Sequence, residues 1–215
     1  MTDVAGMAAD LRAGALALLP TDTVYGLVCL AASREAALDL YRLKGRVEIQ
    51  PTAVIAADTD VVLASIPGLG GIASAGIRSL LPGPFTLVVP NPEQRFSWLS
   101  AARPETIGVR VPALAGLAAA IVRNVGLVVA TSANLPGEPD PCRLEEVPAE
   151  IRAGVAFEVD GGGLPGTPST VIDLTGAAPV VLRAGAGDPK QALRTLADAL
   201  MESSPPDHAP LTRGQ

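Results

Sequence analysis

The sequence is poor in the side chains that most often carry acid–base and metal chemistry. Its single histidine, His208, lies in a proline-rich C-terminal stretch. A Ser-His-Asp triad, a Cys-His pair and a histidine-ligated metal site are therefore not indicated. If the protein is an enzyme, we expect it to act by positioning and electrostatics rather than through a histidine base.

Cysteines, aromatic residues and long apolar runs are also scarce. Cys29 and Cys142 are far apart, which argues against a zinc site or a disulfide framework, and Cys29 follows a strand-like run that predicts a core position. The six aromatic residues (one Trp, two Tyr, three Phe) leave the core to aliphatic side chains. No apolar run approaches the roughly 20 residues of a membrane span. Asp3 and Asp10 stand where a signal peptide carries positive charge. We therefore expect a cytoplasmic protein without membrane contact.

Basic residues are outnumbered by acidic ones, 16 to 22, and the formal net charge is −6. This balance disfavours nonspecific binding to a nucleic-acid backbone. It still permits a local basic cleft and a weak contact with RNA.

What the sequence does contain is an alternation of helix-like and strand-like segments, which predicts a single α/β domain. We expect this domain to span residues 1–201, and the Ser-, Pro- and Asp-containing residues 202–215 to form a disordered tail. Helices are expected at 4–13, 33–43, 60–66, 72–81, 114–122, 143–153 and 190–201. Strands are expected at 15–19, 24–31, 52–57, 85–89, 106–111, 127–131, 170–174 and 180–183.

Two basic residues, Lys44 and Arg46, follow the predicted helix 33–43. In an acidic chain, such a pair beside a glycine is a candidate anion site. The alternative is a solvated cationic pair, because basic side chains also suit the C-terminal end of a helix dipole. In either case we expect their substitution to change stability by no more than about 0.5 kcal/mol, as at an exposed position.

Further polar and basic residues lie where predicted strands end. Residues 131–134 (Thr-Ser-Ala-Asn) close a Val-rich strand, and polar groups at the carboxyl end of a strand in an α/β sheet commonly bind ligands. Arg110 lies within one strand-like run and Arg183 closes another. Together with Lys44 and Arg46, these residues could converge on one polyanion. A capped loop at 131–134 and an Arg110 on an exposed sheet face are the alternatives.

Two glycine-rich segments differ in what they indicate. Residues 68–73 superficially match a dinucleotide-binding loop, but they follow Pro67 rather than a strand and predict a turn before a helix. Residues 161–166 lack the Lys-Ser/Thr pair of a P-loop. They form either a flexible surface turn or, because they lead to the hydroxyls of Ser169 and Thr170, part of a site for an anion or a carboxylate.

Seven short motifs, taken together and in order, resemble those of the YrdC-like L-threonylcarbamoyladenylate synthases. The resemblance covers roughly residues 8–200, and the extra C-terminal domain of some members has no counterpart here. The motifs are Pro20-Thr21-Asp22-Thr23-Val24-Tyr25-Gly26-Leu27, Lys44-Gly45-Arg46, Pro82-Gly83-Pro84-Phe85-Thr86, Val109-Arg110-Val111-Pro112, Thr131-Ser132-Ala133-Asn134, Ser169-Thr170-Val171 and Arg183-Ala184-Gly185.

The resemblance implies a fold and a reaction. The fold would be a single-domain α/β structure, a twisted open mixed sheet with flanking helices and a large concave basic cavity. The enzyme would be a nucleotidyltransferase that makes L-threonylcarbamoyladenylate and pyrophosphate from L-threonine, bicarbonate and ATP, with Mg²⁺ carried on the ATP. The product would pass to a tRNA threonylcarbamoyl transferase for N6-threonylcarbamoyl modification of adenosine 37.

The resemblance also implies roles for individual residues, none of them as a metal ligand. Lys44 and Arg46 would be the catalytic cations on the phosphates or the carboxylated amine. The L-threonine site would be formed by Thr23, Arg110, Ala130 and Ser169. The ATP site would be formed by Lys44, Arg46, Gln50, Thr106, Ser132, Asn134, Asp140 and Arg183.

The sequence departs from the family pattern at a few of these places. Ile55 stands where some relatives have a His near threonine, and Asp140 stands where Ser is frequent. Segment 47–55 also differs from the common pattern. Two alternative functions therefore remain: a weakly active or non-catalytic paralogue that binds nucleotide or RNA, and another carbamoyl transferase that uses a carbamoyladenylate.

Overall fold

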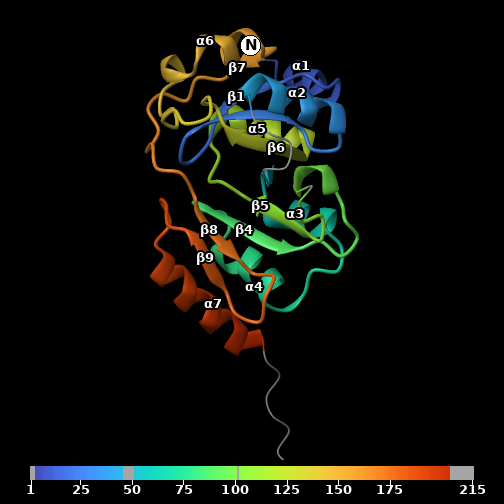
Figure 1. Cartoon of the computed structure of the whole chain (residues 1–215), viewed down its shortest axis with the longest axis vertical. Helices are drawn as coiled ribbons and strands as arrows, with labels where there is room; N and C mark the ends of the chain where they lie inside the picture. Colours follow the sequence, from blue (N-terminus) through green and yellow to red (C-terminus); the bar gives the residue numbers. More distant parts are fainter. Residues whose placement is uncertain (1–2, 46–50, 101, 204–215) are drawn as a thin grey trace, which may run out of the picture.

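A computed structural model describes residues 3–45, 51–100 and 102–203. It shows a mixed α/β fold with a nine-stranded sheet and flanking helices (Figure 1), as the sequence predicts. The strands are β1 (Ala17–Pro20), β2 (Tyr25–Leu30), β3 (Ala53–Ala56), β4 (Phe85–Pro90), β5 (Thr106–Arg110), β6 (Leu127–Ser132), β7 (Phe157–Glu158), β8 (Thr170–Asp173) and β9 (Val180–Arg183). The helices are α1 (Val4–Arg12), α2 (Arg34–Lys44), α3 (Thr59–Ser65), α4 (Gly71–Leu80), α5 (Gly116–Val125), α6 (Ala149–Ala153) and α7 (Pro189–Ser203), with 3₁₀ turns η1 (Ser97–Ser100) and η2 (Leu144–Glu146).

The strand order in the sheet is β7-β1-β2-β6-β3-β5-β4-β8-β9. The pairs β7–β1, β3–β5 and β4–β8 are parallel, and the remaining neighbours are antiparallel. Helices α1, α2, α5 and α6 lie on the side of the molecule toward β7, α4 and α7 lie toward β9, and α3 lies beside the central strand β3 (Figure 1). The sheet is therefore both open and mixed.

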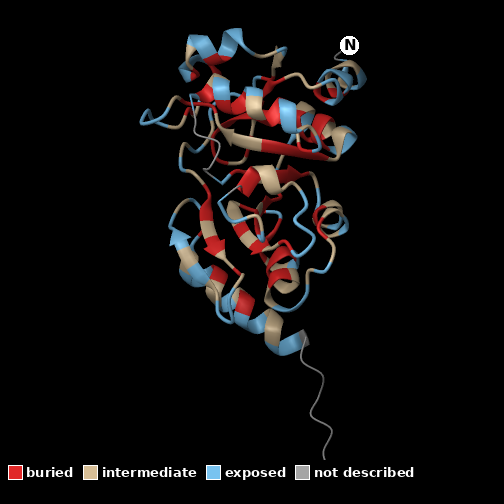
Figure 2. Ribbon diagram, turned by 45° about the vertical axis from the view of Figure 1, so that its right-hand side comes forward, coloured by how far each residue is buried: buried red, intermediate tan, exposed pale blue. Residues whose placement is uncertain are grey.

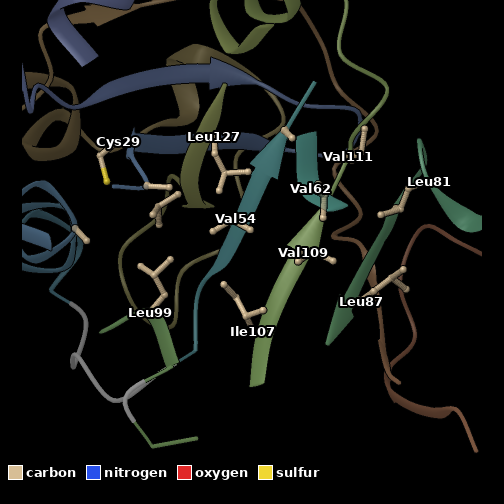
Figure 3. Packing of buried hydrophobic residues seen from close by; sticks show 14 of the residues in the cluster. Cys29, Val54, Val62, Leu81, Leu87, Leu99, Ile107, Val109, Val111 and Leu127 are labelled. Carbon is tan, nitrogen blue, oxygen red and sulfur yellow. The ribbon is translucent and has the colours of Figure 1, made fainter. Parts of the chain in front are cut away.

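The first face of the sheet is covered along most of its width. Alternate residues of the strands, such as Val54, Ile107 and Val109, are buried there in one apolar cluster (Figure 3). Helices α2, α3, α4, α6 and α7 contribute to the same cluster. Figure 2 shows the resulting pattern, with buried residues along the strands and exposed residues on the outer sides of the helices. Because side chains alternate along a strand, the residues between these positions belong to the second face.

The second face is covered only in part. Helices α1 and α5 supply Leu11, Ala118, Ile121 and Val122 to a separate, smaller cluster with the inner strands near the β7 end. Residues paired across neighbouring strands point to the same side, so one row of this face can be followed across the sheet. The row contains Ala17, Val28, Ala130, Ala53, Gly108 and Val88. Its first residues lie in the smaller cluster, whereas Gly108 and Val88 lie where no cluster residue covers them.

Helix α2 forms where the sequence predicts it, and its ends are defined by local chemistry. The Ser33 side chain accepts a hydrogen bond from the Ala36 amide at 3.1 Å, which satisfies one of the free donors at the N-terminus. Gly45 ends the helix with a φ of 65°, a left-handed conformation that favours glycine. Lys44 is consequently the last helical residue.

The predicted helix 143–153 is wrong as a single element. The structure has η2, then Val147 and Pro148, and then the short helix α6. Proline disfavours the helical conformation in the residue before it and has no amide hydrogen to donate, so the helix is interrupted at this point. Strand β7 and the turn η1 are further elements that the sequence pattern did not predict.

Other expectations concern single residues and the end of the chain. Cys29 is fully buried in the first-face cluster, as predicted, and burial raises the pKa of its thiol to about 12. Helix α7 continues to Ser203, two residues beyond the predicted domain boundary, and the tail from 204 onward lies outside the described residues. Across the described part of the chain, no helix combines the length and apolar character needed to cross a bilayer.

Candidate ligand-binding cavity

A cavity of about 370 Å³ lies over the uncovered half of the second face. We call this region the open half, and the region beneath α1 and α5 the covered half. The lining follows strand alternation, because Thr106, Gly108 and Arg110 of β5 line the cavity while Ile107 and Val109 belong to the first-face cluster. The other strands and loops that contribute lining residues do so through Thr21, Thr23, Val24, Gly26, Pro51, Thr52, Ala53, Ile55, Thr86, Val88, Ser100, Arg103, Ala130, Thr131, Ser132, Asp140, Pro168, Ser169, Val171, Leu182 and Arg183.

The turn between β1 and β2 is held together by the Thr21 hydroxyl. This hydroxyl donates to the Val24 carbonyl at 2.7 Å and accepts from the Thr23 and Val24 amides at 3.2 and 3.3 Å. The Thr21 and Thr23 hydroxyl oxygens are 3.1 Å apart. A short turn with this many internal hydrogen bonds holds Asp22 and Thr23 in a fixed orientation.

Arg110 extends from β5 to this turn. Its Nη2 donates to Asp22 Oδ1 and, at 2.7 Å, to Thr23 Oγ1. The Arg110 side chain is only 10% exposed, and its Nε has no hydrogen-bond partner among the described residues. Burial lowers the pKa of Arg110, and the nearby positive charge of Arg183 lowers it further, whereas Asp22 raises it. The guanidinium is therefore a buried cation at the cavity wall with donor capacity left over.

The opposite wall is formed by the start of β8 and the end of β9. Ser169 Oγ lies 2.8 Å from Thr86 Oγ1. Arg183 donates from Nη2 and Nε to the Ser169 carbonyl at 2.8 and 3.2 Å, and from Nη2 to the Ser169 hydroxyl at 3.3 Å. Ser169 is buried whereas Arg183 is exposed. This wall therefore offers hydroxyl groups and one solvent-accessible cation.

Lys44 lies behind the wall rather than on the surface. Its Nζ donates to the carbonyl oxygens of Ser132 and Asn134 at 2.5 and 2.8 Å and to Asn134 Oδ1 at 2.7 Å, with Ser132 Oγ at 3.4 Å. Only 6% of the residue is exposed. The expectation that Lys44 occupies an exposed position is therefore wrong. Because its removal would leave several oxygens without their donor, we now expect its substitution to lower stability.

The loop after β6 is shaped by the same group of atoms. Ser132 Oγ donates to Asn134 Oδ1 at 2.7 Å, and Asn134 Nδ2 donates to the Glu138 carbonyl at 2.6 Å. Asn134 is buried and does not line the cavity, whereas Ser132 and Asp140 do. Lys44 and Asn134 thus hold the loop that places Ser132 and Asp140 at the wall.

The structure brings most of the predicted site residues together. Lys44 and Asn134 lie directly behind the wall, and Arg46 and Gln50 lie outside the described residues. The predicted residues that line the cavity are Thr23, Thr106, Arg110, Ala130, Ser132, Asp140, Ser169 and Arg183. Predicted residues from three separate strands, β5, β6 and β9, and from the loops at Thr23, Asp140 and Ser169 therefore line one cavity.

Sequence reasoning missed some lining residues. Thr86 closes the motif Pro82–Thr86, so a signal for it was present, although that motif was read only as a family marker. Arg103 adds a further cation to the lining, and its guanidinium lies 3.5 Å from Glu105 and 3.7 Å from Asp173. No pattern in the sequence distinguishes Arg103 from an ordinary exposed arginine.

The glycine-rich segment 161–166 does not line the cavity. The Gly166 amide donates to the Thr23 carbonyl at 2.9 Å, and the Leu164 amide donates to the Cys142 carbonyl at 2.8 Å. Gly161 packs so closely on Pro20 that a Cβ at this position would lie 2.6 Å from a proline carbon. The segment is therefore held in place by hydrogen bonds and close packing, and it leads to Pro168 and Ser169, which do line the cavity.

Comparison with known proteins places this chain in a family. A family model named Sua5/YciO/YrdC, with the description telomere recombination, matches residues 9–185. The chain is similar to a threonylcarbamoyl-AMP synthase of Bacillus subtilis, with 36% identity over 189 residues that cover 85% of this chain and 53% of that protein. It is also similar to a putative threonylcarbamoyl-AMP synthase of Mycobacterium tuberculosis H37Rv, with 33% identity over 81% of this chain and 80% of that protein.

Solved structures agree with this family assignment. The structure of P. abyssi Sua5 complexed with L-threonine matches with a TM-score of 0.79 and 29% identity, over 89% of this chain and 56% of that chain. The structure of E. coli YciO matches with a TM-score of 0.78 and 26% identity, over 88% and 92% of the two chains. This chain spans about half the length of the B. subtilis and P. abyssi proteins. By sequence and by fold, the chain belongs to the Sua5/YciO/YrdC family.

Proposed function

We propose that the protein is an L-threonylcarbamoyladenylate synthase and that the cavity over the open half is its active site. The observation that carries the proposal is the convergence of Arg110, Ser169 and Arg183 on one cavity in a chain similar to proteins named threonylcarbamoyl-AMP synthase. The cavity volume of about 370 Å³ lies within the range of small-molecule sites. Its hydroxyls and guanidinium groups suit ligands that carry carboxylate and phosphate.

The proposed reaction consists of two bond-forming steps. The amine of L-threonine attacks bicarbonate, water leaves, and a carbamate forms. A carbamate oxygen then attacks the α-phosphorus of ATP, and pyrophosphate leaves with the electrons of the broken P–O bond. All reactants are anionic, so fixed cations and donors that reduce their mutual repulsion and align them lower the barrier. Neither step needs a histidine base.

On this proposal, L-threonine binds at the turn between β1 and β2 and at the start of β8. Arg110 would bind the carboxylate through its positive charge and through the guanidinium hydrogens that Asp22 and Thr23 do not use. Ser169 and the backbone beside Ala130 would complete the site, with Thr23 holding Arg110 from below through the 2.7 Å hydrogen bond to its Nη2. Ile55, also in the lining, would add an apolar surface for the threonine side chain.

ATP would occupy the remainder of the cavity. Arg183 is the exposed cation of that wall and would lie on the phosphates, while Thr106, Ser132 and Asp140 would contact the rest of the nucleotide. Lys44 and Asn134 would act by holding the loop after β6 in place. Arg46 and Gln50, outside the described residues, remain predicted ATP contacts.

We further infer that Mg²⁺ arrives with the triphosphate. Among the described lining residues Asp140 is the one carboxylate, and no group of three or more His, Cys, Asp and Glu residues in the described part of the chain could hold a metal ion. A single carboxylate beside bound phosphates is a common arrangement for Mg²⁺, which keeps most of its ligands as phosphate oxygens and water. We also propose that the protein acts in the cytoplasm, contacts RNA weakly if at all, and passes its product to a tRNA threonylcarbamoyl transferase.

The test is pyrophosphate release from ATP by the purified protein, with L-threonine and bicarbonate omitted in turn, and with the product identified by mass spectrometry. The proposal predicts release that requires both co-substrates and a product with the mass of L-threonylcarbamoyladenylate. Release that is indifferent to L-threonine would overturn it and favour another carbamoyl-transfer reaction. Nucleotide binding without any release would favour a non-catalytic paralogue.

A further inference from the structure

Asp22 lies beside the cavity and has no role in the functions assigned above. Its Oδ1 accepts from Nη2 of Arg110, and its Oδ2 accepts from the Ala113 amide at 3.1 Å. The side chains of Asp22 and Arg110 are only 11% and 10% exposed. The carboxylate thus joins the turn between β1 and β2 to β5 and to the segment that follows it.

The hydrogen bonds of Arg110 leave a defined part of its guanidinium for a ligand. Nη2 carries two hydrogens, and both are used, one by Asp22 and one by Thr23. The Nε hydrogen has no partner among the described residues either, but this nitrogen is buried. The side chain lines the cavity, and Nη1, for which the described residues offer no hydrogen-bond partner, is the nitrogen left for a ligand. Asp22 therefore determines which donors of Arg110 are satisfied internally and which remain available.

Asp22 also balances the charge of Arg110. A lone guanidinium binds phosphate and carboxylate by the same paired donors, so donor geometry alone would not separate an amino acid from the phosphates of a nucleotide. A carboxylate within hydrogen-bond distance of the guanidinium repels a second anion, and it repels a phosphate dianion more strongly than a monocarboxylate. Arg183, by contrast, has hydrogen bonds to Ser169 but no ion pair with a described carboxylate.

We propose that Asp22 is a specificity-determining residue. It holds Arg110 in place and reduces its net charge, so that the subsite accepts the carboxylate of an amino acid and refuses phosphate groups, which are left to Arg183. The inference rests on the proposed function in one respect, namely that the carboxylate belongs to L-threonine. The refusal of phosphate depends only on the Asp22–Arg110 pair.

The test compares Asp22→Asn with the wild-type protein and uses inorganic phosphate as the probe. The substitution keeps the shape of the side chain and removes its charge. We expect the KM for L-threonine to rise about tenfold or more, with the KM for ATP nearly unchanged, because the lost partner is a charged hydrogen bond to Arg110. We also expect inorganic phosphate to become a competitive inhibitor against L-threonine, with an inhibition constant at least about tenfold lower than in the wild-type protein.

Asp60→Asn is the matched control. Asp60 lies on α3 in an exposed pair with Arg78, with an N–O distance of 3.7 Å and 88% of its side chain exposed. This variant is expected to change neither the KM for L-threonine nor the inhibition constant of phosphate. A purely structural role of Asp22 would lower activity towards both substrates together and would not create sensitivity to phosphate. Unchanged phosphate inhibition, or an equal rise in both KM values, would overturn the proposal.

A direct binding measurement separates this inference from the proposed function. Phosphate binding to both proteins is measured by calorimetry, without turnover. If the wild-type protein makes no product but Asp22→Asn gains phosphate binding, the proposed function fails and the inference stands. If the wild-type protein is active and Asp22→Asn gains no phosphate binding, the inference fails alone. Should Asp22→Asn not fold, Asp22→Ser, whose hydroxyl can accept one of the two hydrogen bonds, replaces it under the same criteria.

Discussion

The covered half and the open half of the second face belong to one continuous sheet but carry different side chains. In the covered half, Val28 and Val128 are buried against α1 and α5. In the open half, residues in the same rows include Gly108 and Arg110, and the lining contains Thr86 and Thr106. Where helices cover the strands, burial requires apolar side chains, and where they do not, the sheet also presents hydroxyls, cations and glycines beside apolar residues such as Val88 and Val171. The cavity is thus the uncovered continuation of a packed interface.

The largest expected effect lies in the covered half. Leu11→Ala removes a fully buried side chain of α1 from the smaller cluster. We expect a loss of about 2–5 kcal/mol in the free energy of unfolding, from lost burial and the resulting cavity. Activity per folded molecule should be unchanged, as measured by denaturant unfolding and by pyrophosphate release on the same samples. A loss of specific activity without a loss of stability would show that the covered half contributes to the site.

In the open half we expect the reverse, a loss of activity with little loss of stability. Arg183→Ala removes an exposed cation from the cavity wall, so we expect kcat/KM to fall about a hundredfold with little change in melting temperature. Arg194→Ala, on the exposed side of α7, is the control and should affect neither measurement. Comparable losses of melting temperature and activity in Arg183→Ala would assign this residue to the fold rather than to the site.

Lys44 belongs to both regions, since it is buried and also holds the loop at the wall. Lys44→Met keeps most of the apolar stem but leaves the oxygens of Ser132 and Asn134 without their donor. We expect a loss of about 1–3 kcal/mol in the free energy of unfolding together with reduced activity. Lys190→Met, at an exposed position of α7, is the matched control. An unchanged unfolding free energy would contradict the role of Lys44 as the donor that holds this loop.

The smallest expected effect is the difference between one kind of substitution, Val to Thr, made in the covered half and in the open half. Val128→Thr places a hydroxyl beneath α5, whereas Val88→Thr places one in the cavity lining, where the residue is half-buried. We expect the first to destabilise by about 1–2 kcal/mol more than the second, because only the buried hydroxyl lacks water. Thermal unfolding of both variants measures the difference. Equal destabilisation would mean that water reaches a side chain in the open half no better than in the covered half.

Much of this arrangement could be predicted from the sequence. Strands such as β4 and β5 read as apolar runs between proline and glycine breaks, and helix α2 has its cap at Ser33 and its end at Gly45. The alternation that buries Val109 and leaves Arg110 at the other face is a local property of the chain. Local patterns therefore predicted both the elements and the positions of polar residues at strand ends.

The remainder depends on contacts between distant residues. Asp22 and Arg110 are 88 positions apart, and so are Lys44 and Ser132, and no local pattern indicates that either pair meets. A lysine at a helix end looks the same in sequence whether its ammonium is solvated or surrounded by carbonyl oxygens. Which half of the second face α1 and α5 cover is likewise decided by packing, and this choice is what creates the cavity.

The most direct test is a crystal structure of the protein with L-threonine and a non-hydrolysable ATP analogue. We predict that the amino-acid carboxylate contacts Arg110 beside Ser169, and that the phosphates lie near Arg183, both within the open half. The contradicting result would be both ligands bound elsewhere, for example in the shallow groove between α4 and α7 at Ser74, Arg78 and Glu202, with the open half empty.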